Sequence, residues 1–141
     1  MNPIQFTVYG VPQVKGSTRA FVPKGWTRPI VTSTNKNLKD WERKIASAAN
    51  DHATGVLLTE PLSVTLNFYL SRPVSLPKKR YWPSTRPDLD KLIRGATDAL
   101  TKVLWHDDGQ VVSIHAMKRY TKVAEEAPRV EITIQSMSEE M

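Results

Sequence analysis

The segment from Asp90 to Val103 carries its apolar residues at the spacing of one helical face. These residues are Leu92, Ile93, Ala96, Ala99, Leu100 and Val103. The spacing predicts an amphipathic helix, and Asp90 has a side chain suited to the N-cap. Such a helix has to bury its apolar face, so the segment limits the chain to folds in which this helix packs on a second layer.

Alternating apolar and polar residues predict four strands, because side chains alternate between the two faces of a strand. These strands are expected at 4–8, 64–70, 110–118 and 130–134. A second amphipathic helix is expected at 37–53, capped by Asn35 or Asn37. The order predicts an α/β (α+β) fold. We expect a single two-layer domain, residues 1–141, with helices packed on one face of a mixed β-sheet.

Two long segments show neither the helical spacing nor the strand alternation of apolar residues. Residues 12–33 are expected to form an irregular loop or a loose hairpin, and loops of this length in compact domains are usually functional. Residues 71–87, which we call the arm, contain Pro73, Pro77, Pro83 and Pro87. That is too many prolines for a helix or a central strand.

Composition points to an intracellular protein with an anionic partner. The 141 residues include no cysteine, which excludes disulfides and agrees with a reducing cytoplasm. The N-terminus lacks a signal-peptide pattern, and no apolar run of about 18 residues occurs. We therefore expect a cytoplasmic protein without a membrane partner. The net charge of +6 favours nucleic acid as the anionic partner.

The basic residues cluster in segments that contain no acids. No acidic residue precedes Asp40, and none lies between Arg72 and Pro87. These segments are rich in proline and are not amphipathic helices, so they suit a phosphate backbone better than a membrane surface. The residues of these segments predicted to bind DNA are Lys15, Arg19, Lys78, Lys79, Arg80 and Arg86.

Aromatic residues lie among these basic residues. Tyr81 and Trp82 lie in the arm, and Phe21 and Trp26 lie in the earlier segment. Each pair has two interpretations. The rings either stack on DNA bases or pack on the protein itself.

Carboxylates flank the central helix on both sides. Asp88 and Asp90 lie at its start, where the proline after Arg86 favours an extended backbone, and residues two apart then share a face. Asp107 and Asp108 follow the helix in an Asp-Asp-Gly turn. Carboxylates without cysteine or clustered histidine suit a hard cation such as Mg²⁺ or Mn²⁺. A helix packed against the strand that follows would bring both pairs towards the same edge of the fold.

Each of these carboxylates also has an ordinary structural interpretation. Asp90 alone is explained as a helix cap, and Asp107 and Asp108 as part of a turn. Arg94 and Asp98 are four residues apart on one helix and can pair there. The combination of Asp-x-Asp, helix, Asp-Asp-Gly and strand is what favours a nuclease site.

The order of these motifs resembles the RusA family of bacterial and phage Holliday junction resolvases. The resemblance rests on Pro-Asp-Leu-Asp-Lys-Leu at 87–92, Asp-Ala-Leu-Thr at 98–101, Trp-x-Asp-Asp-x-Gln-Val at 105–111 and the strand closing on Lys118. It implies a RusA-like endonuclease domain that resolves four-way DNA junctions in recombination and repair. It also implies magnesium dependence and a homodimer, whose two-fold symmetry matches the two strands to be cut.

The resemblance implies roles for individual residues. Asp88, Asp90 and Asp108 correspond to the catalytic metal-binding aspartates, with Asp107 as a neighbouring ligand. Arg94 stands where the family has a lysine. Arginine keeps the positive charge for a phosphate but cannot act as a base. Lys118 matches the strand lysine of the family and is expected at the DNA.

Two other functions compete with this one. The chain could be a junction-binding or DNA-binding protein without activity, in which the acids are caps and turns. It could also be another type of metal nuclease. Pro87 and Asp88 begin a PD-(D/E)xK pattern, but no (D/E)-x-K follows at a suitable distance. The three histidines show no ligand spacing.

Overall fold

The computed structural model describes residues 1–16, 18–33, 35–122 and 126–137 of the 141-residue chain. Its elements are β1 (Ile4–Tyr9), β2 (Thr18–Phe21), β3 (Ile30–Ser33), α1 (Leu38–Asn50), β4 (Leu62–Leu70), α2 (Leu89–Leu100), the 3₁₀ helix η1 (Asp108–Gln110), β5 (Val111–Tyr120) and β6 (Arg129–Ser136). No helix among these described residues is long and apolar enough to cross a membrane.

Strands β1, β6, β4 and β5 form one mixed sheet, in that order. β6 pairs antiparallel with β1 and with β4, whereas β5 pairs parallel with β4. A parallel pair requires a crossover connection, which here contains the arm and α2. β5 is therefore an edge strand whose neighbour in this sheet is β4.

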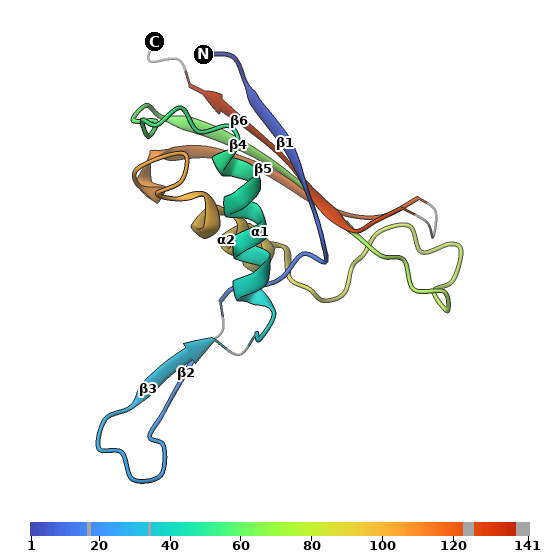
Figure 1. The fold of residues 1–141 in the computed structure, drawn as a ribbon. Helices are drawn as coiled ribbons and strands as arrows, with labels where there is room; N and C mark the ends of the chain where they lie inside the picture. Colours follow the sequence, from blue (N-terminus) through green and yellow to red (C-terminus); the bar gives the residue numbers. More distant parts are fainter. Residues whose placement is uncertain (17, 34, 123–125, 138–141) are drawn as a thin grey trace.

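Both helices cover one face of the sheet (Figure 1). Along β4, buried apolar residues alternate with half-buried ones, as expected for a strand with one face in the core. The core joins this face to Trp41 and Ile45 of α1 and to Leu92 and Leu100 of α2. Burying such a side chain stabilises the fold by roughly 1.5–3 kcal/mol. The predicted two-layer α+β domain with a mixed sheet is confirmed.

Strands β2 and β3 form a separate antiparallel hairpin that projects away from the main sheet (Figure 1). The loose-hairpin interpretation of residues 12–33 was therefore the correct one. Trp26, in the loop between these strands, is exposed and does not anchor the hairpin. The side chain of Phe21 lies outside the described residues.

The central helix differs from its prediction at both ends. It begins at Leu89, so its N-cap is Asp88 rather than Asp90. Leu89 packs against the core as a helical residue, which favours this earlier start. The helix ends at Leu100 rather than Val103, and Lys102 just beyond it adopts a positive φ of 70°. A left-handed residue cannot continue a right-handed helix.

Candidate active site at the ends of α2

Asp88 and Asp90 are exposed at the start of α2. Asp88 has extended backbone angles, and its carbonyl accepts the first helical hydrogen bond from the Leu92 amide. Its side chain does not cap the helix and instead lies 3.6 Å from Lys91 Nζ. Asp90 makes no hydrogen bond or ion pair with the described residues. Only Asp88 is extended, so the expected extended Asp88–Asp90 segment was wrong for Asp90.

Lys118 of β5 holds the end of the arm in place. Its ammonium donates to the carbonyls of Thr85 and Pro87, at 2.8 and 2.9 Å. Pro87 directly precedes Asp88, so this lysine fixes the backbone that leads into the acidic pair. The sequence prediction gave Lys118 a role at the DNA. In the structure two of its three donors are used inside the protein, and the third is available to a ligand.

Asp107 and Asp108 lie in a turn beyond the other end of α2. Asp107 caps η1, because its side chain accepts from the Gly109 amide at 2.9 Å. Gln110 holds the same turn. Its amide oxygen accepts from the backbone of His106 and Asp107, and its NH₂ donates to carbonyls of the 58–60 segment.

Thr101 connects this turn to α2. Asp108 Oδ1 lies 2.7 Å from Thr101 Oγ1, and the same hydroxyl accepts from Nε1 of the fully buried Trp105. A hydroxyl has one proton, so Thr101 donates either to Asp108 or to the Thr97 carbonyl, which is 2.8 Å away. The Trp-x-Asp-Asp-x-Gln motif is therefore a rigid turn fixed to the C-terminal end of α2.

The three predicted ligands do not converge within one chain. α2 has 12 residues, so its ends are separated by about 18 Å. Asp88 lies at one end, and Asp108 is hydrogen-bonded at the other. Oxygen ligands of one Mg²⁺ lie about 2.1 Å from the ion. Asp108 therefore cannot share an ion with Asp88 or Asp90 of the same chain. Within the described part of the chain, no three Asp, Glu or His side chains are grouped closely enough to hold a metal.

The direction of β5 explains this separation. β5 starts beside Asp108, at the C-terminal end of α2, and ends beside the arm, at the N-terminal end of α2, so it runs antiparallel to the helix. Asp108 comes before β5 and therefore stays at the C-terminal end of α2. The return of the chain along β5 therefore carries Lys118, and not Asp108, to the start of α2.

Arg94 and Arg86 are exposed near the acidic pair. Asp90 and Arg94 are four residues apart on α2, so both face the same side of the helix. The alternative pairing of Arg94 with Asp98 does not occur, because Asp98 binds Lys15 at 3.1 Å. The guanidinium of Arg94 makes no hydrogen bond or ion pair with the described side chains, which leaves it available to a phosphate.

Lys15 is tied to the protein rather than displayed to a ligand. Its ammonium lies 3.1 Å from Asp98 and 3.5 Å from Glu42. Burial alone would lower the pKa of Lys15, but the hydrogen bond and charge of Asp98, joined by Glu42, outweigh burial and raise it. Its backbone amide also donates to the Lys91 carbonyl. Two carboxylates neutralise Lys15, so the structure gives no support to its predicted DNA contact.

Gly95 allows the backbone of residues 13–15 to lie close to α2. A Cβ at this buried position would meet the Gln13 carbonyl oxygen at 3.1 Å. The segment before the hairpin therefore crosses α2 next to Arg94.

The remaining predicted DNA contacts lie on exposed segments. Lys78, Lys79 and Arg80 are exposed in the arm. Arg19 lies in β2, and its side chain falls outside the described residues. Arg72 holds the arm by donating to the carbonyls of Pro77 and Arg80, at 2.8 and 2.7 Å.

Sequence reasoning missed the organising residues Thr101, Gln110 and Arg72. For Thr101 and Gln110 a signal was present, since both belong to the motifs around the Asp-Asp turn. No local pattern identifies Arg72 as a residue that holds the arm, because its partners are backbone carbonyls several residues away.

Comparison with known proteins finds related sequences along most of the chain. The family model described as "Endodeoxyribonuclease RusA" matches residues 12–135. An uncharacterized protein of Bacillus subtilis, YqaN, is 32% identical over 148 aligned positions, covering 98% of this chain and 99% of YqaN. The crossover junction endodeoxyribonuclease rusA of Lactococcus phage r1t is 36% identical over 77 positions, covering 52% of this chain and 53% of the phage protein.

The family match includes both ends of α2, the arm and β5. Asp88, Asp90, Arg94, Asp107, Asp108 and Lys118 therefore all lie inside the matched region. The chain belongs to the RusA family of endodeoxyribonucleases.

Proposed function

We propose that this endonuclease is a magnesium-dependent Holliday junction resolvase that cuts two symmetric strands of four-way DNA in recombination and repair. The phage relative is named a crossover junction endodeoxyribonuclease, which supports this substrate. The observation that carries the proposal is the exposed pair Asp88 and Asp90, fixed through Pro87 to Lys118 and followed on the same helix by Arg94.

The acidic pair suits a magnesium ion. Mg²⁺ is usually held by one or two carboxylates together with water and substrate phosphates. Neither the Asp88 nor the Asp90 carboxylate is used in capping the helix. Held by these carboxylates, Mg²⁺ or Mn²⁺ would supply the activation of water and the neutralisation of the leaving oxygen. The protein holds the carboxylates in position, and Arg94 and Lys118 place positive charge where a phosphate would bind.

The third ligand, Asp108, comes from a second copy of the chain in this proposal, with Asp107 as an additional candidate. Within one chain α2, about 18 Å long, separates Asp88 at its start from Thr101, which contacts Asp108, at its end. A two-fold homodimer solves this problem and presents two active sites to a substrate with two equivalent strands.

β5 provides a surface for such a dimer. It is an edge strand, and unpaired edges are templates for pairing with another chain. Val112 and Ile114 are exposed on it, at 60% and 44%. If two β5 strands pair antiparallel about Ile114, the start of one faces the end of the other. Asp108 of one copy then lies towards the arm and Asp88 of the other.

A cleavage assay tests the activity. Labelled four-way junction and a matched duplex are incubated with the protein, with Mg²⁺, with Mn²⁺ or with chelator. We expect paired cuts in the junction with either metal, no cuts with chelator and little cutting of the duplex. Junction binding without any cleavage would instead favour the second candidate, a non-catalytic junction-binding protein.

A mixing experiment tests the shared site. Asp88→Asn and Asp108→Asn are each expected to be inactive while still binding the junction. After co-expression, mixed dimers contain one intact site only if ligands come from two chains. Random pairing then restores about a quarter of the wild-type site number, seen as single nicks. A mixture that stays inactive, although mixed dimers form, would contradict the two-chain site.

A further inference from the structure

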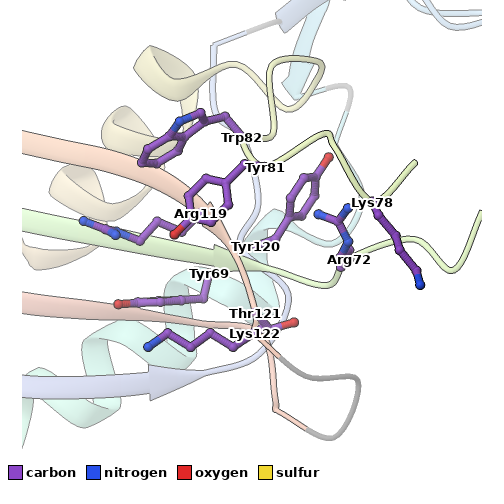
Figure 2. Close-up of a pocket in the computed structure, with 9 residues that line it drawn as sticks. All are labelled: Tyr69, Arg72, Lys78, Tyr81, Trp82, Arg119, Tyr120, Thr121 and Lys122. Atoms are coloured by element: carbon purple, nitrogen blue, oxygen red, sulfur yellow. The ribbon is translucent and has the colours of Figure 1, made fainter. Parts of the chain in front are cut away.

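A pocket separate from the α2 site lies at the ends of β4 and β5, beneath the arm. Its volume is about 420 Å³, and Figure 2 shows the nine residues that line it. Tyr69 alternates along β4 with residues buried under the helices, and Arg119 follows Lys118 on β5. Both side chains therefore point to the sheet face that the helices leave open.

Aromatic rings form one part of this pocket. Tyr81 and Trp82 come from the arm, and Tyr69 and Tyr120 come from the strands (Figure 2). Tyr81 and Trp82 pack edge to face with centroids 5.0 Å apart, yet they remain 68% and 47% exposed. Neither ring is among the residues packed against the hydrophobic core, so the expected alternative of packing onto the core is not observed. Burial raises the pKa of Tyr69, and nearby Glu131 raises it further, so its phenol stays neutral.

Positive charge forms the other part. Arg72, Lys78, Arg119 and Lys122 line the pocket, and no acidic side chain is among the lining residues that the structure describes. The Nε of Arg119 is buried and has no hydrogen-bond partner among the described residues. Its guanidinium lies 5.9 Å from the Trp82 ring centroid, so an arginine charge and an aromatic face adjoin each other.

This combination selects one class of ligand. Flat aromatic rings recognise a flat unsaturated ring by stacking, and arginine and lysine recognise phosphate. Phosphate alone would not require the exposed rings, and a cation or apolar peptide would be disfavoured by four positive charges. A base in duplex DNA is already stacked on both faces and cannot enter such a pocket.

We propose that this pocket binds a single unpaired nucleotide, with its base on Trp82 and Tyr81 and its phosphate near Arg119 and Lys122. The inference deepens the proposed function, since a strand junction is where bases can be unstacked. The arm connects the two sites directly, because it carries Trp82 and then leads through Pro87 into Asp88. A free nucleotide has the same base and phosphate, so the test includes both a DNA strand and a free mononucleotide.

The test measures equilibrium binding by calorimetry with the intact protein and no metal. The probes are a short oligothymidylate, the abasic oligomer of the same length, and thymidine 5′-monophosphate. We expect the oligothymidylate to bind about tenfold more tightly than the abasic oligomer, because only the oligothymidylate has a base that can stack on the aromatic rings. Trp82→Ala should remove that difference. Arg119→Gln should weaken both oligomers, since it removes a phosphate contact.

The control is Tyr9→Ala, which removes an exposed aromatic from β1, two strands away from β4 on the same sheet. It should leave both affinities unchanged, and thermal melting should show that all variants are folded. Tight binding of the mononucleotide would support the pocket but assign it to a free nucleotide. Equal binding of normal and abasic oligomers, unchanged by Trp82→Ala, would overturn the proposal. Junction cleavage does not enter this assay, so the proposed activity stands or fails separately.

Discussion

The positive φ angle of Lys102 lowers the stability of the folded protein. With a φ of 70° it adopts a left-handed conformation directly after α2, and its amide donates to the Trp105 carbonyl at 2.7 Å. For a residue with a Cβ this conformation costs about 1–2 kcal/mol. We predict that Lys102→Gly stabilises the protein by about 0.5–1 kcal/mol, part of the gain being offset by the greater freedom of glycine when unfolded. Chemical denaturation measures the change.

Lys102→Ala is the matched control, because it removes the same charge but keeps the Cβ. It should give no gain in the free energy of unfolding. An equal gain from alanine would show that charge, and not backbone strain, limits stability at this exposed position.

Arg94 tests the electrostatic part of the proposed site. Its guanidinium has no partner in the described structure, and it lies one turn after Asp90. If it neutralises a phosphate in the transition state, Arg94→Ala should lower kcat/KM for the junction by about 10- to 100-fold, the value of a charged hydrogen bond. Arg94→Lys should retain most activity, because the charge is kept. Full activity of the alanine variant would remove Arg94 from the site.

Residue types alone did not show which lysines are hydrogen-bonded or ion-paired within the protein. Lys15 and Lys118 resembled Lys78 and Lys79 in the sequence, since all four lie in basic surroundings. In the structure Lys15 is held by Asp98 and Glu42, and Lys118 by two carbonyls. Their partners lie 27 to 83 positions away for Lys15 and more than 30 for Lys118. Such contacts exist only after folding, so no local pattern could predict them.

At the scale of elements, the edge of β5 carries a prediction about assembly. Ile114→Lys places a charge at the centre of the proposed strand pairing, so it should convert the dimer into monomers. Sedimentation measures the mass, and cleavage should fall in parallel. Val56→Lys, at another exposed apolar position, is the control and should remain dimeric and active. A dimeric Ile114→Lys protein would place the interface elsewhere.

The periodicity of apolar residues correctly predicted which segments are helices and which are strands. It did not predict where these elements end or which residues lie beside them. The alternation in 64–70 and the helical spacing in 92–100 are strong local signals, and both elements are present. The start of α2 was misplaced because Asp88 and Asp90 are both suitable caps. The position of Asp108 depended on the packing of Thr101 and Trp105, which fix the turn at the far end of the helix.

The charge of the whole molecule predicts how junction binding depends on salt. Lys78, Lys79, Arg80 and Arg86 are exposed. If each neutralises one phosphate, these four residues contribute about −3.6 per chain to the slope of log affinity against log salt, and Lys79→Met should reduce the slope by about 0.9. Filter binding in chelator at several salt concentrations measures the slope.

Lys15→Met is the control for this series. Its charge is already neutralised by Asp98 and Glu42, so the slope should not change. A slope near zero for the wild-type protein would argue against phosphate contacts altogether.

The length of α2 has a consequence for how the enzyme would behave when it is scarce. Because the helix separates Asp88 from Asp108, an isolated chain would hold only part of a metal site and would leave DNA intact. Under the proposed pairing, cleavage would rise with the square of protein concentration until the dimer is saturated, and linearly thereafter. A newly made chain would thus be harmless to the genome until a second copy accumulated. The length of α2 would then determine the protein concentration at which DNA cleavage begins.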